Sequence, residues 1–291
     1  MALTLDRSGS FPRVATKRKT KVSVGFEWEV PADIEEPECT CCEEGYIDED
    51  GNREEYCSYC CGEDGSRVDL NRVTKDFIET HGFRTHIECG GTEFASPVFG
   101  NITTARRVAG LLKGVALQDR ALGPEVADYN ACGIHVHTGH TDWNKGVGYE
   151  YSTDVESVYA QVVSMLNRKS SAAFVLEFSG RENGNTHYLT QAVSSCWDYT
   201  EGVTTPTREQ LSYMRCMKMV RPNCFGRIGT VEYRLWDAAE DRLIPAIEFA
   251  HACTTFITRR KDIPYLKEFK LWLDRQSGYK VLKQDNAWRL L

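Results

Sequence analysis

Two short segments carry pairs of metal-ligating residue types at alternate positions. Glu27 and Glu29 flank Trp28, and His135 and His137 flank an apolar residue in the same way. Successive side chains of a β-strand point to opposite faces, so each pair would share one face while the apolar residue turns to the core. Neighbouring carboxylates repel each other unless a cation lies between them. The spacing favours a metal site over a solvated sheet face, which remains the alternative for any single strand.

Two further segments repeat this pattern. The segment 230–235 alternates apolar residues with Glu232 and Arg234, and the segment 93–97 puts Glu93 on a polar face. Carboxylate oxygens and an occasional imidazole suit Mg²⁺, and arginine suits phosphate oxygens. The four segments therefore predict a Mg-nucleotide site on the polar face of a sheet. The chain has neither G-x-x-x-x-G-K-[ST] nor G-x-G-x-x-G, so side chains and metals would have to hold the phosphates.

Periodicity and capping signals predict the elements that must position these residues. We expect strands over about 21–30, 84–98, 131–138 and 229–237. We expect helices over about 71–80 and 103–122, and others that begin near 154, 207 and 243. Short strands separated by long helices favour an α+β domain built on a mainly antiparallel sheet over a parallel βαβ array.

Acidic charge is concentrated in one segment. The 291-residue chain has a formal net charge of −7, but the segment 33–69 has 14 acidic residues against two basic ones. Six of the 12 cysteines lie in that segment, and the others are scattered, which is typical of reduced thiols in a cytosolic protein. The sequence has no signal-peptide pattern and no apolar run of the ~18 residues that span a membrane. We expect a cytoplasmic protein with no membrane partner, a flexible basic tail over 1–20 and a catalytic domain over 21–291.

The acidic segment predicts a small zinc module inserted over residues 31–70. Cys39-x-x-Cys42 and Cys57-x-x-Cys60, with 14 residues between the pairs, have the spacing of a two-knuckle structural zinc site. Two neighbouring cysteines leave open which four of the six thiolates bind. Because the module is strongly acidic, it would repel a phosphate backbone, and nucleic-acid binding is not expected. A lid, or a docking surface for a cationic amine or a basic protein, fits the charge better.

Taken in order along the chain, these motifs resemble those of the amidoligase family, many of whose members come from phages, within the glutamine synthetase and glutamate–cysteine ligase superfamily. The resemblance is carried by the segments 25–29 (GFEWE), 93–97 (EFASP), 132–137 (CGIHVH) and 230–234 (TVEYR). It implies a glutamine synthetase-like fold, a curved antiparallel sheet with helices on its outer face, and a phage-encoded protein in a host cytoplasm. It also implies ATP-dependent carboxylate–amine ligation, in which an amine attacks an acyl phosphate and an amide, ADP and phosphate are released.

The resemblance also implies residue roles. Two or more Mg²⁺ ions would be held by Glu27, Glu29, Glu93, His135 and Glu232. The nucleotide and transferring phosphate would be contacted by His137 and Arg234, with Arg181 as a further catalytic candidate and Arg227, Arg215 or Arg221 as a further nucleotide or substrate contact. An additional metal ligand is expected before Glu93, for which Glu88 and His86 compete. The sequence identifies neither the carboxylate nor the amine, each a small molecule or a peptide, and it does not indicate an oligomeric state.

Two other function classes fit parts of the pattern. A metal-dependent hydrolase would also use a His-x-His strand, but it needs further ligands downstream, and only His140, His187 and His251 follow. A non-catalytic zinc-bearing binding protein would leave the glutamate and histidine pairs unexplained.

Overall fold

The computed structural model describes residues 21–35, 46–47, 53–54, 67–88, 91–123, 132–143, 153–166, 168–180, 220–223, 229–260 and 262–291. The strands of its main sheet are β1 (Val22–Pro31), β6 (Arg84–Glu88), β7 (Gly91–Ala95), β8 (Gly133–His140), β9 (Val220–Asn223) and β10 (Thr230–Asp237). The α-helices are α2 (Arg72–His81), α3 (Ile102–Ala116), α4 (Thr153–Leu166), α5 (Ala172–Ser179), α8 (Leu243–Ile257) and α9 (Leu266–Asp274). Within these residues, no helix is long and apolar enough to cross a membrane.

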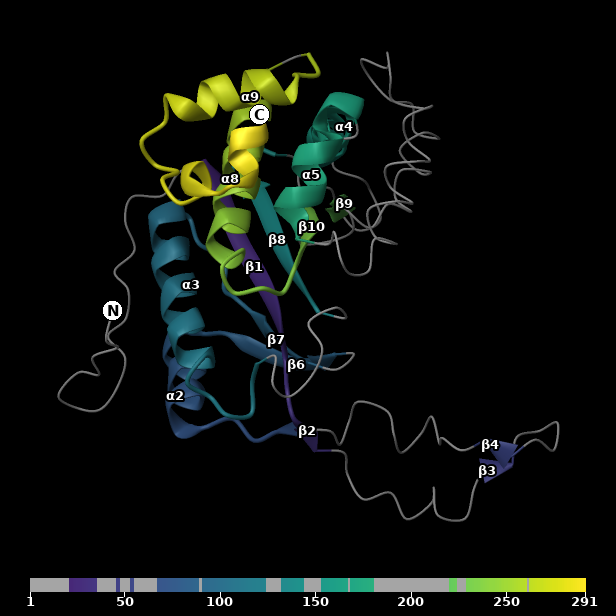
Figure 1. Cartoon of the computed structure of the whole chain (residues 1–291), viewed down its shortest axis with the longest axis vertical. Coiled ribbons are helices and arrows are strands. Elements are labelled where there is room, and N and C mark those ends of the chain that lie inside the picture. The colour runs from purple at the N-terminus through teal and green to yellow at the C-terminus, as the bar shows by residue number, and fades with distance from the viewer. Residues whose placement is uncertain are drawn as a thin grey trace.

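The main sheet has six strands in the order β6-β7-β1-β8-β10-β9, and each neighbouring pair is antiparallel. The expected α+β architecture with an antiparallel sheet is therefore confirmed. The long strand β1 lies at the centre, between β7 and β8 (Figure 1). Segments that are far apart in the sequence, near residues 27, 93, 135 and 232, thus lie on adjacent strands.

One face of the sheet forms the hydrophobic core. Phe26 and Trp28 of β1 and Ile134 and Val136 of β8 are almost fully buried on this face. Helices α3 and α8 pack against β1, and α4 and α5 pack against β10 (Figure 1). The Trp28 indole Nε1–H donates a hydrogen bond to the Ala238 carbonyl at 2.8 Å, which ties β1 to the end of β10. The period-two pattern of these strands thus leaves the polar residues on the opposite face.

Helix α2 forms close to the predicted range 71–80, and both of its ends are capped. The Asn71 side chain accepts a hydrogen bond from the Thr74 amide at 2.9 Å, and Gly82 follows the last turn with φ 70°. Helix α3 begins after Asn101, whose side chain accepts from the Thr103 amide, and it ends at Ala116. The predicted end near residue 122 is therefore too late, because turns connect α3 to residue 123. The helix predicted from residue 207 lies outside the described residues.

The single strand predicted over residues 84–98 is wrong. The segment forms two antiparallel strands, β6 and β7, with Arg84 opposite Ala95 and His86 opposite Glu93. At the start of β7, a Cβ on Gly91 would lie 2.6 Å from the Val30 carbonyl oxygen, so this position admits no side chain.

The alternation predicted over residues 230–235 is confirmed, since Val231, Tyr233 and Leu235 are buried and Arg234 contacts Glu232, but it does not continue to Trp236. Tyr233 pairs with Val136, whereas the next core pair joins Trp236 to Ile134, so β10 has one more residue than β8 in this interval. Such a bulge reverses the face parity of the residues that follow it. Trp236 is consequently buried, with its ring packed edge-on against Phe178.

Two small antiparallel ladders lie within the segment predicted to form the inserted module. They pair β2 (Ile34–Glu35) with β5 (Arg67–Val68), and β3 (Tyr46–Ile47) with β4 (Arg53–Glu54). Cys39, Cys42, Cys57 and Cys60 lie outside the described residues, so the zinc site stays a prediction.

Candidate metal and nucleotide site

Strand register arranges the polar face in transverse rows. One row runs from Arg84 on β6 through Ala95 on β7 and Glu27 on β1 to His135 on β8. A second row runs from His86 through Glu93 to Glu29. A third row runs from Gly25 through His137 to Glu232. Adjacent strands are ~4.8 Å apart, so the acidic and imidazole side chains converge although they come from four separate strands.

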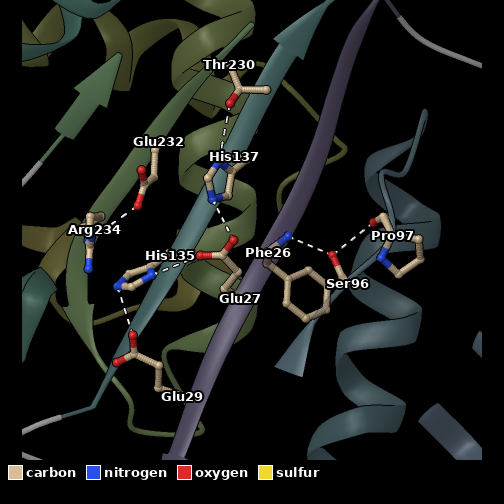
Figure 2. A network of polar contacts seen from close by, with 10 residues as sticks. All are labelled: Phe26, Glu27, Glu29, Ser96, Pro97, His135, His137, Thr230, Glu232 and Arg234. Atoms are coloured by element: carbon tan, nitrogen blue, oxygen red, sulfur yellow. Dashed lines mark hydrogen bonds and ion pairs between the residues drawn. The ribbon is translucent and has the colours of Figure 1, made fainter. Parts of the chain in front are cut away.

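The two histidines contact the carboxylates of β1. The Nδ1 atom of His135 lies 3.1 Å from a carboxylate oxygen of Glu27, and its Nε2 lies 3.5 Å from one of Glu29. The Nε2 atom of His137 lies 3.1 Å from the other oxygen of Glu27. Figure 2 shows Glu27 between the two imidazole rings. A neutral imidazole has one N–H donor, so both contacts of His135 can be hydrogen bonds only if the ring carries a second proton.

Three side chains of β10 complete the cluster. The Nε atom of Arg234 lies 3.5 Å from a carboxylate oxygen of Glu232, and the Thr230 hydroxyl lies 3.3 Å from Nδ1 of His137 (Figure 2). Glu232 is buried and is directly opposite His137 in the sheet. The β10 bulge follows Tyr233, so Glu232 keeps its position on the polar face.

Glu27 and His137 shift each other's protonation equilibria. Burial alone would raise the pKa of Glu27, but hydrogen bonds from His135 and His137, together with their charges, hold this pKa well below its usual value. Burial would lower the pKa of His137, whereas the hydrogen bond with Glu27 and the negative charges of Glu27, Glu232 and Glu93 raise it. Glu27 is therefore ionised at neutral pH and can act as a metal ligand.

The donor geometry suits two cations that share one carboxylate. Glu27, His137 and Glu232 offer ligand atoms within 4.8 Å of one another, and so do Glu27, Glu93 and His135. Glu29 belongs to neither group, although it lies directly opposite Glu93 and beside His135. Like charges directly opposite on a sheet destabilise it unless a cation intervenes. Carboxylates with an occasional imidazole are the donor chemistry of hard divalent ions, so the residues fit Mg²⁺.

A cavity of about 680 Å³ adjoins the cluster. Glu27, Glu93 and His137 line one part of it, and Arg84 and His86 line another. Its other lining residues include Gly25, Gly139 and Gly229, which lack side chains, and the small residues Ser23, Ala95 and Ser96. A Cβ at Gly25 would meet nothing closer than Ser96 Oγ at 3.7 Å, so this glycine leaves room in the cavity and relieves no steric conflict.

Ser96, in the segment 93–97, has a structural role that sequence reasoning missed. Its hydroxyl accepts a hydrogen bond from the Phe26 amide at 2.8 Å and donates one to the Pro97 carbonyl at 3.0 Å (Figure 2). Its own amide donates to the Phe26 carbonyl at 2.8 Å. Ser96 thereby extends the pairing of β7 with β1 past Ala95 and fixes the strand that carries Glu27. The hydroxyl between Ala95 and a proline was the available signal.

The structure does not decide the roles of the remaining predicted site residues. Arg181, Arg227 and Arg215 lie outside the described residues, and the side chain of Arg221, on β9 opposite Glu232, is not described. Between the two competitors for the additional metal ligand, His86 is exposed and lines the cavity, but it belongs to neither group of ligand atoms. Glu88 ends β6, opposite Gly91, and its side chain lies outside the described residues. The choice between them stays open.

Comparison with solved structures gives distant structural neighbours. No family model matches the chain, and no curated protein matches it. A crystal structure described as that of a novel glutamine synthase homolog aligns with 92% of this chain at 14% sequence identity and a TM-score of 0.39. The alignment covers 65% of that protein, so this chain spans less than two thirds of its length.

Proposed function

We propose that this protein is an ATP-dependent carboxylate–amine ligase of the amidoligase type, which forms an amide through an acyl phosphate. The observation that supports this proposal best is the pair of ligand groups that share Glu27 at the edge of a 680 Å³ cavity. Phosphoryl transfer to a carboxylate needs positioned charges more than a covalent nucleophile. A polar sheet face rich in carboxylates and imidazoles, with arginines at hand, meets that need.

The ligands proposed for magnesium are Glu27, Glu29, Glu93, His135 and Glu232. Bound Mg²⁺ would bridge phosphate oxygens and neutralise the charge that develops during transfer. In this proposal Arg234, held by Glu232, contacts phosphate oxygens. His137, whose two ring nitrogens lie against Glu27 and Thr230, contacts phosphate by exchanging one of these two partners. Arg181 and Arg227 keep their proposed roles in nucleotide or substrate contact on sequence grounds.

We also propose that Cys39, Cys42, Cys57 and Cys60 bind a structural Zn²⁺. Metal analysis of purified protein by mass spectrometry should find one zinc per chain, and Cys57→Ser should lose it.

If the acidic surface attracts the amine, joint neutralisation of Glu43, Glu44, Asp48, Glu49 and Asp50 should raise the KM for that substrate. An unchanged KM would exclude this role.

A metal-dependent hydrolase would need further ligands after His137, and the two described histidines that follow it, His140 and His251, do not supply them. His140 accepts a hydrogen bond from the Asp142 amide at 3.1 Å, and His251 is buried on α8 beside the Tyr279 hydroxyl. Neither belongs to a group of metal-ligand atoms among the described residues. The imidazole-rich ligand set that such a hydrolase needs is therefore not assembled from them.

The test is ADP release from ATP and Mg²⁺ in the presence of mixed amines and carboxylates, combined with calorimetric measurement of nucleotide binding. Wild-type protein should release ADP only when both an amine and a carboxylate are present. Glu232→Gln should abolish this release and retain the fold. Glu79→Gln, which removes the same charge from the exposed side of α2, is the matched control and should behave as wild type. Absence of both turnover and nucleotide binding in wild-type protein would overturn the proposal.

A further inference from the structure

Arg84 stands apart from the other charged groups near the cluster. It is exposed on the edge strand β6 and lines the same cavity as Glu27, Glu93 and His137. Among the described residues, its guanidinium has no ion pair or hydrogen bond, although carboxylates lie on β7, which pairs with β6, and on β1, the next strand of the sheet. Arg234, by contrast, is held by Glu232. Arg84 is therefore a cation available to a ligand.

The sheet register fixes the position of Arg84 relative to the cluster. Arg84, Ala95 and Glu27 occupy one transverse row, so the Cα atoms of Arg84 and Glu27 are roughly 10 Å apart across two strand spacings. Ala95, between them, offers only a methyl group. The row therefore has a gap, open to the cavity, between a guanidinium and the carboxylate shared by both groups of metal ligands.

The charges around this gap select the kind of group that can fill it. An anion would face Arg84 on one side and metal-bound Glu27 on the other. A cationic group would be repelled by Arg84 and by any bound metal. Guanidinium forms paired, charge-assisted hydrogen bonds with phosphate oxygens, and the neighbouring His86 can add a further donor.

We propose that Arg84 is a phosphate-binding residue, which holds an oxyanion of the nucleotide's phosphate chain over Ala95 while the same chain reaches the cluster at Glu27. This inference rests on the proposed function and adds a contact from the opposite edge of the site to Arg234. In this position Arg84 contacts the phosphate groups of a ligand and does not contact its nucleoside. Binding orders its exposed side chain.

Calorimetry with Mg-ATP, Mg-tripolyphosphate and adenosine tests the proposal in the full-length protein. Arg84→Gln should weaken binding of Mg-ATP and of Mg-tripolyphosphate by about 10- to 100-fold, the loss of one charge-assisted contact. Adenosine affinity should not change. Arg84→Lys should recover part of the loss, because it restores the charge without the paired donors.

The matched control is Arg107→Gln, which removes an exposed arginine from α3 on the helical side of the sheet. It should leave all three affinities within twofold of wild type, which separates a local contact from a change in net charge. If wild-type protein binds Mg-ATP and Arg84→Gln binds it equally well, the role of Arg84 is overturned while the ligase proposal stands. If wild-type protein binds neither Mg-ATP nor Mg-tripolyphosphate, both proposals fail.

Discussion

Buried carboxylates occur in two regions of this protein, and their partners differ in kind. On the helical side of the sheet, Glu248 of α8 is fully buried, forms an ion pair with Arg106 of α3 and accepts a hydrogen bond from the Leu282 amide at 2.7 Å. Arg106 also donates to the Gly278 carbonyl at 2.7 Å. This closed set of contacts ties the C-terminal segment to two helices.

On the polar face, within the described part of the chain, the acidic residues outnumber the arginines that form ion pairs with them. The recorded ion pairs there join His135 to Glu27 and Glu29, His137 to Glu27, and Arg234 to Glu232. A guanidinium stays charged at any accessible pH, whereas an imidazole can release its proton to make room for a metal. Burial of a carboxylate therefore does not indicate its role in this protein. The kind of residue that balances its charge, arginine or histidine, indicates whether the carboxylate is structural or available to a metal.

The largest expected effect comes from removal of one acid of the cluster. Glu93→Gln should lower turnover by roughly 10²- to 10³-fold, because it removes a proposed ligand next to the transferring phosphate. In magnesium-free buffer its free energy of unfolding should equal or exceed that of wild type, since the charge opposite Glu29 disappears. Added Mg²⁺ should stabilise wild type more than the variant in thermal melts. Strong destabilisation of the variant without magnesium would contradict a metal-holding role.

The corresponding change in the structural region should have the opposite result. Glu248→Gln should lower the free energy of unfolding by about 3 kcal/mol, because it leaves the partly buried Arg106 without its counter-ion. Its affinity for Mg-ATP should match wild type. Denaturant unfolding and calorimetry measure the two quantities. A variant as stable as wild type would show that this ion pair is not what holds the C-terminal segment.

His251, a histidine buried on the helical side of the sheet, should make the stability of the protein depend on pH. Burial lowers the pKa of His251 on α8 to about 4, from 6.5. Below pH 6.5 the His251 imidazole is protonated in the unfolded chain, whereas in the folded protein it stays neutral until about pH 4. Stability should therefore be fully present above pH 6.5 and fall by up to about 3 kcal/mol as the pH drops towards 4. His251→Phe should remove this part of the pH dependence in urea titrations; an identical acid sensitivity in both proteins would exclude the assignment.

The smallest effect is expected directly behind the cluster. The Tyr233 hydroxyl lies 2.8 Å from the Thr254 hydroxyl, which lies 2.7 Å from that of Thr138, all buried between the sheet and α8. Tyr233→Phe should cost about 1 kcal/mol of stability, the net value of one buried hydrogen bond. Mg-ATP affinity should stay within twofold of wild type. A large loss of affinity would show that this network also positions the neighbouring Glu232.

The sequence predicted the polar face well because period-two alternation within a strand is a local signal. Glu27, His135 and Glu232 converge since their strands are neighbours, as four strands with the same pattern suggested. The division into β6 and β7 was missed because the segment reads as one continuous strand, although Gly90-Gly91 was an available signal. The bulge in β10 could not be read, since two successive apolar residues hide the change of parity.

Long-range partners were the other part that the sequence could not reveal. The contact of Arg106 with Glu248 spans 142 positions, and nothing in either local pattern indicates the other residue. Arg84 was overlooked for a similar reason. Its relation to Glu27 exists only through Ala95 on the strand between them.

The glycine at position 25 offers a route to the identity of the ligand. A methyl group at this position would lie at ordinary van der Waals distances from its neighbours. The Gly25→Ala variant should therefore fold normally, and its side chain should narrow the cavity. Successively larger residues at position 25 would narrow the cavity step by step and leave the proposed metal ligands unchanged. The affinities of these variants for nucleotide analogues that each lack one chemical group would reveal which part of the ligand lies over the centre of the sheet.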